Sequence, residues 1–317
     1  MSASAASSHT SAVLIMGPTG AGKTDLAIRL ADQLPVEIVS VDSAMVYRGM
    51  DIGTGKPTPD VLRRYPHHLV DILDPAQSYS AGQFVRDAYR AIDEIRERGR
   101  LPLLVGGTML YFRALRRGLA EMPQADADIR GAIDAEAAVR GWPAMHAELA
   151  AVDPRAAARI QPRDAQRIQR ALEVYRLTGT PLSALHAAAK PPRADVSFVA
   201  YAWSPGDRLQ LHQAIERRFH RMMEEGLLDE VRRLYNRGDL HAALPAIRSV
   251  GYRQLWEHLQ SEESLDSAVQ RAIFATRRLA RRQLIWLRAE DELQWVDALE
   301  PDATALMERS IGAMVKR

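Results

Sequence analysis

The sequence predicts an α/β protein in which a parallel sheet is flanked by helices and an all-helical insertion domain interrupts the chain. Two observations predict this class. Short apolar runs alternate with amphipathic stretches between residues 12 and 120, whereas residues 121–190 show helical patterns only. Strands that alternate with helices favour a parallel sheet covered on both faces. We therefore expect one α/β core, formed by residues 12–120 and 191–317, that also contains the C-terminal helices.

The first strand of the core is expected at Ala12–Met16, an apolar run that stops at Gly17. The next helix is expected at Asp25–Leu34 and ends before Pro35, because proline cannot continue a helix. Further strands are expected at Val36–Val41, Leu69–Ile72, Leu101–Val105 and Asp195–Ala202. Further helices are expected at Ser80–Arg98, Asp207–Arg233, Tyr252–Gln260 and Leu265–Arg288.

Glycine or proline interrupts the helical pattern of the insertion at four places. These are Gly141–Pro143, Asp153–Pro154, Gln161–Pro162 and Gly179–Pro181. Pro191–Pro192 is expected to form the hinge that returns the chain to the core. Residues 1–11 are small and polar, with neither a basic start nor an apolar stretch, so we expect a disordered tail and not a signal peptide.

Composition excludes several classes of protein. The chain has 317 residues, of which 47% are hydrophobic and 26% charged, values typical of a soluble globular protein. Its longest apolar runs are far shorter than the roughly 20 residues that cross a bilayer, so no membrane partner is expected. The chain has no cysteine, which excludes disulfides, a catalytic thiol and a thiolate zinc site. We expect a cytoplasmic monomer.

The net charge of +2 does not indicate a nucleic-acid partner, but the distribution of charge does. Residues 154–193 contain eight basic and two acidic residues, and residues 271–288 contain six arginines and no acid. Such clusters are typical of surfaces that bind a phosphate backbone. The alternative for each cluster is an ordinary solvated helix face.

The stretch Gly17-Pro18-Thr19-Gly20-Ala21-Gly22-Lys23-Thr24 has the P-loop pattern and lies between an expected strand and an expected helix. Its glycines allow backbone N–H groups to surround phosphate oxygens, and the following helix adds its positive end. Lys23 is suited to the terminal phosphate and the Thr24 hydroxyl to Mg²⁺. The core is therefore expected to be P-loop NTPase-like and to bind a polyphosphate, although the motif does not say which molecule carries the phosphates.

Asp42 ends the second strand, where ligands bind in open α/β sheets. Three roles remain open for it: a Mg²⁺ ligand, a general base or a helix N-cap. Asp71 is a second candidate for the metal role, with a surface turn as the alternative.

Gly106-Gly107-Thr108 follows the fourth strand at the same edge of the sheet. The two glycines would allow a ligand to approach the backbone closely, and Thr108 offers a hydroxyl. An ordinary strand-to-helix turn with Thr108 as N-cap is the alternative.

One helix of the insertion is expected to have a basic face, because Arg163, Arg167 and Arg170 recur at helical spacing. Gln166 and Gln169 lie beside this face. The opposite, core-facing stripe consists of Ile168, Leu172 and Tyr175.

Together these motifs resemble one family, the bacterial tRNA dimethylallyltransferases, also called tRNA isopentenyltransferases. The matching stretches are Gly17–Thr24, Val41–Tyr47, Met50–Pro57, Gly106–Tyr111, Asp164–Glu173 and Arg248–Arg253. The eukaryotic members of the family carry a zinc finger, which a chain without cysteine lacks, so the resemblance is to the shorter bacterial form.

The resemblance implies transfer of a dimethylallyl group from dimethylallyl diphosphate to N6 of the adenine 3′ of the anticodon, tRNA position 37, with release of diphosphate. Lys23 and Mg²⁺ on Thr24 would then offset charge on the leaving group. By the same resemblance, Asp42 is the general base for the attacking amine, and Thr108 hydrogen-bonds near the reacting centre. Arg218 is expected to bind the diphosphate, with an exposed ion pair to Glu216 or Glu224 as the alternative.

The resemblance also implies a set of tRNA contacts, and the target base must leave the anticodon-loop stack to react. The expected contacts are Asp42, Ser43, Ala44, Met45, Thr108, Arg130, Gln166, Arg167, Ile168, Gln169, Arg170, Arg248, Ser249, Val250, Gly251, Tyr252 and Arg253. Two other functions remain as alternatives. One is a small-molecule or nucleoside kinase, since P-loops commonly bind ATP. The other is a tRNA-binding module whose P-loop is only a structural anion site.

Overall fold

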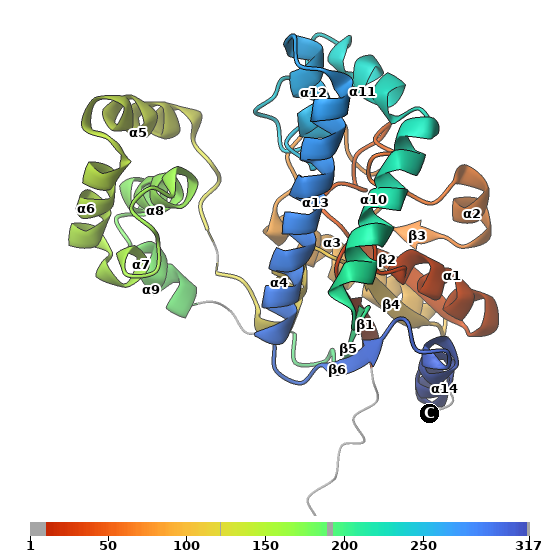
Figure 1. Ribbon diagram of the computed structural model, residues 1–317. Coiled ribbons are helices and arrows are strands. Elements are labelled where there is room, and N and C mark those ends of the chain that lie inside the picture. The colour runs from red at the N-terminus through yellow and green to blue at the C-terminus, as the bar shows by residue number, and fades with distance from the viewer. Residues whose placement is uncertain (1–10, 121, 189–192, 316–317) are drawn as a thin grey trace, which may run out of the picture. The chain divides into compact units, whose positions relative to one another are not determined.

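The computed structural model describes residues 11–120, 122–188 and 193–315 (Figure 1). The chain divides into two compact units. The core unit holds the described residues of Met1–Ala114 and Ala194–Arg317, and the helical unit holds those of Leu115–Arg193.

The core unit contains a sheet in which every pairing is parallel, and within the described residues the strand order is β3-β2-β4-β1-β5-β6. The strands are β1 (Ala12–Met16), β2 (Val36–Val41), β3 (His67–His68), β4 (Leu101–Gly106), β5 (Phe198–Ser204) and β6 (Gln294–Asp297). The central strand β1 is entirely buried, and Val13 lies opposite Leu103 on one side and Val199 on the other. The parallel sheet flanked by helices is therefore confirmed.

Helices surround this sheet (Figure 1). The helices of the core unit are α1 (Lys23–Gln33), α2 (Pro59–Arg64), α3 (Ala81–Glu97), α10 (Arg208–Glu224), α11 (Leu227–Tyr235), α12 (Tyr252–Gln260), α13 (Leu265–Arg288) and α14 (Ala303–Val315). Val13 and Ile15 of β1 share one apolar cluster with Leu30 of α1 and Ile311 of α14. A second cluster joins α10, α11, α12 and α13, and it includes Tyr47 from the loop after β2.

The helix α4 (Met109–Arg117) carries the chain from the core unit into the helical unit. The helical unit contains α5 (Ala127–Arg140), α6 (Trp142–Val152), α7 (Pro154–Ala157), α8 (Ala165–Thr178) and α9 (Leu182–Ala187). The four expected interruptions each fall at a boundary or in a gap between two successive helices of this unit. Its apolar centre includes Ile133, Met145, Leu149, Ile168 and Leu172, each of which is fully or almost fully buried.

Several expected elements are wrong in place or extent. Leu69–Ile72 is not a strand, because Leu69 and Asp71 have φ of 64° and 56°, and the edge strand β3 lies just before them. The helix expected at Asp207–Arg233 is two helices, since the chain turns at Gly226 with φ of 97°. The strand expected at Asp195–Ala202 starts later, at Phe198. The elements α2, β6 and α14 were not expected from the sequence.

The expected tail is wrong at Ser11, which is buried and whose amide donates to the Ser197 carbonyl oxygen at 3.0 Å. Residues 1–10 lie outside the described residues, as do Pro191 and Pro192 of the expected hinge.

Candidate functional site

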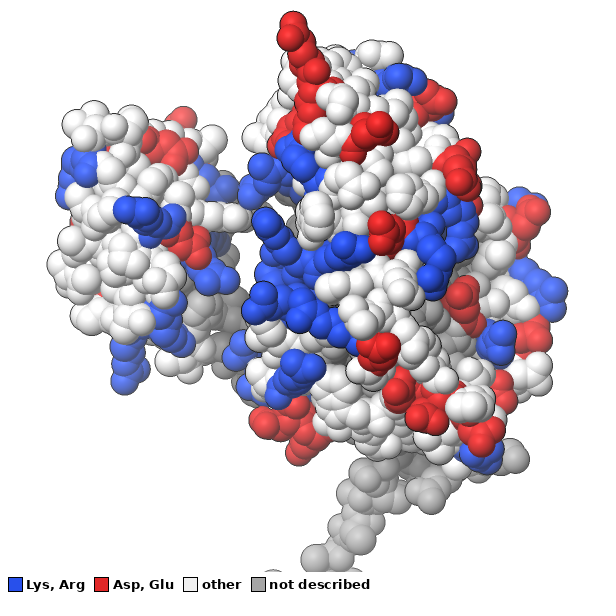
Figure 2. All heavy atoms as spheres, in the orientation of Figure 1, with Lys and Arg blue, Asp and Glu red and all other residues white. Residues whose placement is uncertain are grey.

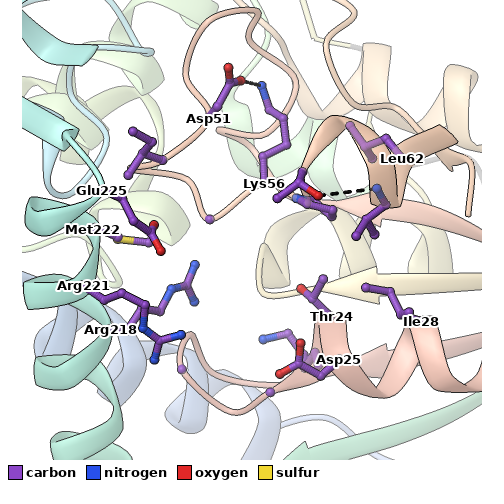
Figure 3. Close-up of a pocket in the computed structure, with 18 of the residues that line it drawn as sticks. Thr24, Asp25, Ile28, Asp51, Lys56, Leu62, Arg218, Arg221, Met222 and Glu225 are labelled. Carbon is purple, nitrogen blue, oxygen red and sulfur yellow. Dashed lines mark hydrogen bonds and ion pairs between the residues drawn. The ribbon is translucent and has the colours of Figure 1, made fainter. Parts of the chain in front are cut away.

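Three adjoining cavities open at the carboxyl ends of the strands in the core unit. The first, of about 760 Å³, is bounded by the glycine-rich loop, by residues 51–62 and by α10 (Figure 3). The second is a narrow cavity of about 80 Å³ that reaches Asp42 and Gln283, and the third, of about 500 Å³, extends from Asp42 to Trp286. Arg218 lines all three cavities. The narrow cavity shares Lys23 and Thr24 with the first cavity and Asp42 and Gln283 with the third, and we call the three together the channel.

The loop Gly17–Thr24 joins β1 to α1, and its conformation is fixed by the rest of the protein. Gly20 and Gly22 have φ of 83° and 78°, which glycine adopts without strain. The Trp203 indole N–H donates to the Ala21 carbonyl oxygen at 2.8 Å. The Thr19 amide donates to the Gln283 side chain at 2.9 Å. The amides of the first turn of α1 have no helical acceptors and remain available to an anion.

Lys23 is a cation whose charge is poorly compensated. Its ammonium group donates to the Pro18 carbonyl oxygen at 2.7 Å. Burial, helped by the nearby Arg218 charge, lowers the pKa of Lys23 to about 7, and the Asp42 carboxylate opposes this shift. Bound diphosphate would supply the missing negative charge and favour the protonated form.

Arg218 lies on α10 and faces the glycine-rich loop across the first cavity. Figure 3 shows Arg218 and Arg221 on one side of this pocket, with Thr24 and Asp25 on the other. The Arg218 guanidinium donates to the Thr54 carbonyl oxygen at 3.2 Å. Burial lowers the pKa of Arg218, while the charges of Asp42 and Asp25 partly oppose this change. Within the described ranges no carboxylate lies at ion-pair distance from Arg218. The alternative, an ion pair from Arg218 to Glu216 or Glu224, is therefore not formed; Glu216 pairs with Arg277 instead.

Asp42 and Thr108 meet where the second and third cavities adjoin. The Oδ1 atom of Asp42 accepts hydrogen bonds from the amides of Ala44 at 2.8 Å and Met45 at 3.2 Å. The Thr108 hydroxyl oxygen accepts from the Ser43 amide at 3.1 Å. Asp42 thus caps a turn and not a helix, and both side chains line the cavity wall.

The glycines at 106 and 107 line the narrow cavity, as expected for a ligand-facing turn, and they also allow close packing of the protein. A side chain at position 106 would overlap the Val41 carbonyl group, and one at position 107 would overlap the Gln283 amide. Gln283 donates to the Gly107 carbonyl oxygen at 2.8 Å. It therefore joins the Gly106–Thr108 turn to the glycine-rich loop. Its sequence context, between arginines of α13, gave no signal of this role.

The surroundings of Asp71 favour the surface-turn alternative over the metal role. Its carboxylate accepts from the Lys56 ammonium at 2.5 Å, and its φ of 56° fits the surface-turn alternative. Among the residues that the structure describes, no three His, Asp or Glu side chains are arranged to hold a metal ion. Thr24 lines the first and second cavities, so its hydroxyl could act only together with oxygens of a ligand.

His67 also lines the narrow cavity, and it was not expected from the sequence. Its Nδ1 donates to the Tyr65 carbonyl oxygen at 2.6 Å, which leaves Nε2 as an acceptor. Nε2 is buried and has no hydrogen-bond partner among the described residues. Burial lowers the pKa of His67, so the ring is neutral near pH 7.

The residues expected to contact tRNA fall into both units. In the core unit, the third cavity is lined by Asp42, Ser43, Ala44, Thr108, Arg248, Ser249 and Val250. Met45 lines the second cavity, and Arg253 is exposed and paired with Glu257 at 2.8 Å. Tyr252 also lines the third cavity; it is fully buried from water, and its hydroxyl donates to Glu230 at 2.5 Å. Gly251 is buried beside it.

In the helical unit, the residues expected to contact tRNA differ in exposure and in their protein partners. Gln166 and Arg167 are exposed on α8. Ile168 is fully buried, so its side chain cannot contact tRNA. Arg170 and Arg130 both bind a buried carboxylate, and the amide of Gln169 donates to an aspartate. These three contacts are Arg170–Glu173 at 2.6 Å, Arg130–Glu173 at 2.8 Å and Gln169–Asp134 at 2.6 Å.

The surface of the core unit carries a concentration of basic side chains over α13 and the neighbouring part of α10 (Figure 2). On α13 the exposed members include Arg278, Arg281 and Arg282, and Arg282 also lines the third cavity. This end of the channel therefore suits a polyanion.

Comparison with known proteins decides the family. The family described as IPP transferase matches residues 45–290, and the family described as isopentenyl transferase matches residues 10–70. The chain is 55% identical to the tRNA dimethylallyltransferase of Burkholderia pseudomallei, over 96% of this chain and 95% of that one. The enzyme of the same name from Cupriavidus taiwanensis is 56% identical over 93% of each chain. This chain belongs to the tRNA dimethylallyltransferase family.

Solved structures agree with this family. The tRNA isopentenylpyrophosphate transferase of Bacillus halodurans has 36% identity and a TM-score of 0.68, with 97% of each chain covered. A eukaryotic dimethylallyltransferase acting on tRNA has 24% identity and a TM-score of 0.79, over 96% of this chain and 80% of that one, a likeness that concerns the fold alone. Within the described residues, this dimethylallyltransferase-family chain contains no helix with the length and apolarity needed to cross a membrane.

Proposed function

We propose that the protein transfers a dimethylallyl group from dimethylallyl diphosphate to N6 of the adenine 3′ of the anticodon in tRNA. Membership of the tRNA dimethylallyltransferase family supports the reaction class. The observation that carries the proposal is the pair of cations, Lys23 and Arg218, that face one channel without a carboxylate ion pair in the described part of the chain. Two such cations suit a diphosphate, because its charge compensates for their desolvation.

In this proposal the diphosphate lies between Arg218 and the P-loop formed by Gly17–Thr24. The free amides at the start of α1 and the Lys23 ammonium bind its oxygens. Thr24 is the residue that would hold Mg²⁺, since this ion often takes one or two protein ligands and completes its shell with water and substrate phosphates. Mg²⁺ would offset the charge on the leaving group. The oxygen ligands that the protein offers in these cavities would therefore hold Mg²⁺ only together with oxygens of the bound substrate.

The dimethylallyl group is placed in the narrow cavity, whose lining includes Ala27, Ile38, Met45 and Val105. The adenine enters from the third cavity, so the two substrates meet beside Asp42. As N6 forms a bond to the dimethylallyl carbon, the bond from that carbon to the diphosphate oxygen breaks. Asp42 takes the proton from N6, and Lys23 and Arg218 stabilise the negative charge on the departing diphosphate.

Asp42 is suited to this role because the amides of Ala44 and Met45 fix its Oδ1 atom, the second oxygen accepts no hydrogen bond from the described residues, and the residue lines two cavities. An aromatic amine is a poor nucleophile, so removal of its proton during attack lowers the barrier. Thr108 is placed to hydrogen-bond beside the reacting amine, since its hydroxyl lies on the same cavity wall. The tRNA is proposed to contact the α13 arginines and, in the helical unit, Gln166 and Arg167.

The test is an incubation of the protein with unmodified tRNA and radiolabelled dimethylallyl diphosphate. We expect label on the tRNA, and Asp42→Asn should lower kcat by about 10²–10⁴-fold while tRNA affinity stays within a few fold. The exposed Asp266→Asn serves as a matched control with wild-type turnover. Transfer of phosphate from ATP to a small acceptor, without prenylation, would instead identify a kinase. Binding of tRNA without transfer from either donor would identify a binding module.

A further inference from the structure

The segment Met50–Pro57 lines the first cavity, yet most of its polar groups are bound to protein. The amides of Asp51, Ile52 and Gly53 all donate to the Glu230 carboxylate, at 2.9, 2.9 and 3.1 Å. Glu230 lies on α11 and is only 2% exposed. Three converging backbone donors hold this end of the segment to the α11 carboxylate.

Tyr252 completes the surroundings of Glu230. Its hydroxyl donates to the carboxylate at 2.5 Å, and its ring lies against Gly53 so closely that a side chain at position 53 would overlap it. Burial and the Glu230 charge raise the pKa of Tyr252, so the phenol keeps its proton and remains a donor. The carboxylate therefore has four donors and no contact with any of the three cavities.

Lys56 fixes the other end of the segment and is not available to a ligand. Its side chain is 2% exposed, and its ammonium group binds the carboxylates of Asp51 and Asp71 at 2.5 Å each. It also donates to the Tyr47 carbonyl oxygen at 2.9 Å. A lysine in a glycine-containing segment beside a phosphate pocket thus has a structural role.

Between these two anchors, the segment contacts Arg218. The Thr54 carbonyl oxygen accepts from the Arg218 guanidinium at 3.2 Å, and the Thr54 hydroxyl donates back to the Met50 carbonyl oxygen at 2.7 Å. Gly55 has φ of 66° and lies against the guanidinium, leaving no space for a side chain. The position of Arg218 therefore depends on the segment, and the position of the segment depends on Glu230.

We infer that Glu230 is a positioning residue for the diphosphate site: it holds Met50–Pro57 in place, and this segment aims the Arg218 guanidinium at the diphosphate. The inference rests on the proposed function, because it names the same diphosphate. Small displacements of a charged donor reduce anion binding strongly. Tyr252 is the second residue of this arrangement, because its hydroxyl binds Glu230, and it also lines the third cavity.

The test is a double-mutant cycle that joins Glu230→Gln with Arg218→Ala. We expect Glu230→Gln to raise KM for dimethylallyl diphosphate about tenfold while KM for tRNA stays within about twofold, since the change acts through Arg218. In the Arg218→Ala background, Glu230→Gln should change KM for dimethylallyl diphosphate less than about twofold. Asp229→Asn, which removes an exposed carboxylate from the same helix, is the matched control.

Equal effects of Glu230→Gln in both backgrounds, or an unchanged KM for dimethylallyl diphosphate, would overturn the inference. If Glu230→Gln fails to fold, Tyr252→Phe removes one of the four donors and enters the same cycle, with an expected rise of about two- to threefold. Calorimetric binding of inorganic diphosphate to wild type and variants gives a readout that needs no transfer. Absent prenylation by wild type would reject the proposed function, while the diphosphate binding data would still decide the role of Glu230.

Discussion

Arg218 in the core unit and Arg130 in the helical unit are both partly buried arginines, but their partners differ. The Arg130 guanidinium donates two hydrogen bonds to the fully buried Glu173 carboxylate, at 2.8 and 3.1 Å. Among the described residues, Arg218 donates to a carbonyl oxygen, and it lines an open channel. When an arginine pairs with a carboxylate, its charge is compensated within the protein. When it binds only a carbonyl oxygen, its charge remains uncompensated and can bind an anionic ligand.

The same contrast divides the basic cluster of the helical unit. Arg170 also binds Glu173, and Arg176 binds Glu136 and Glu148, each at 2.8 Å. Arg155, Arg159 and Arg163 are exposed instead, and the exposed Arg167 forms only a surface ion pair, with Asp164 at 3.4 Å. The number of basic residues in the sequence therefore overstates the charge that this unit can offer to a polyanion.

Among the changes that test this difference between paired and unpaired charges, removal of Arg218 should give the largest effect. We expect Arg218→Ala to lower kcat/KM for dimethylallyl diphosphate by about 10²–10³-fold, because a desolvated donor to the leaving group is lost. Steady-state kinetics with tRNA held at saturation measures this effect. Arg233→Ala, at an exposed position of α11, is the control. A loss below fivefold would show that the unpaired arginine is not a diphosphate ligand.

Removal of the buried partner in the helical unit should affect stability. Glu173→Ala leaves Arg130 and Arg170 without their carboxylate, and both remain partly exposed, so we expect a loss of about 1–3 kcal/mol in the free energy of unfolding. Urea unfolding followed by far-ultraviolet circular dichroism, compared between wild type and Glu173→Ala, measures this loss. KM for dimethylallyl diphosphate should stay unchanged; an increase would contradict a role confined to the helical unit.

Titration of Lys23 should distinguish the cations of the channel from the paired arginines of the helical unit. A paired arginine keeps its charge, whereas Lys23 loses its charge near pH 7. Lys23 is protonated below its lowered pKa, so affinity for inorganic diphosphate should be highest below pH 7. It should fall by up to about tenfold per pH unit above pH 7, which corresponds to about 1.4 kcal/mol. Diphosphate itself ionises near neutral pH, so calorimetry across this range should show a steeper fall in affinity in wild type than in Lys23→Ala. An equal slope in both would assign the titration to another group.

The smallest effect is expected at the exposed face of α8. Arg167→Ala should lower the dependence of tRNA affinity on salt by less than about one unit of log–log slope, because at most one phosphate contact is lost. Filter binding between 50 and 200 mM salt, roughly the range over which such slopes are measured, provides the test. Arg130→Ala should instead reduce stability. An unchanged slope in Arg167→Ala would mean that this face is only solvated.

Local patterns in the sequence predicted much of the sheet and many helices. The ranges Ala12–Met16, Val36–Val41 and Leu265–Arg288 coincide with β1, β2 and α13, because apolar periodicity and flanking glycine or proline act within a few residues. Leu69–Ile72 was wrong for a non-local reason. Arg48 donates to the carbonyl oxygens of residues 71 and 72, and Lys56 binds Asp71, so distant side chains select turn geometry for an apolar run.

By itself the sequence determined many of the elements, the glycine-rich loop and the short set of residues on which the proposal depends, Lys23, Asp42 and Arg218. Only the tertiary structure decided which charged side chains pair with other groups of the protein and which remain for a ligand. Glu173 is 43 residues from Arg130, Glu230 is 179 from Asp51, and Gln283 is 264 from Thr19. Hydrogen bonding and desolvation act over a few ångströms in space, so pairings between such distant positions follow from the fold and not from local pattern.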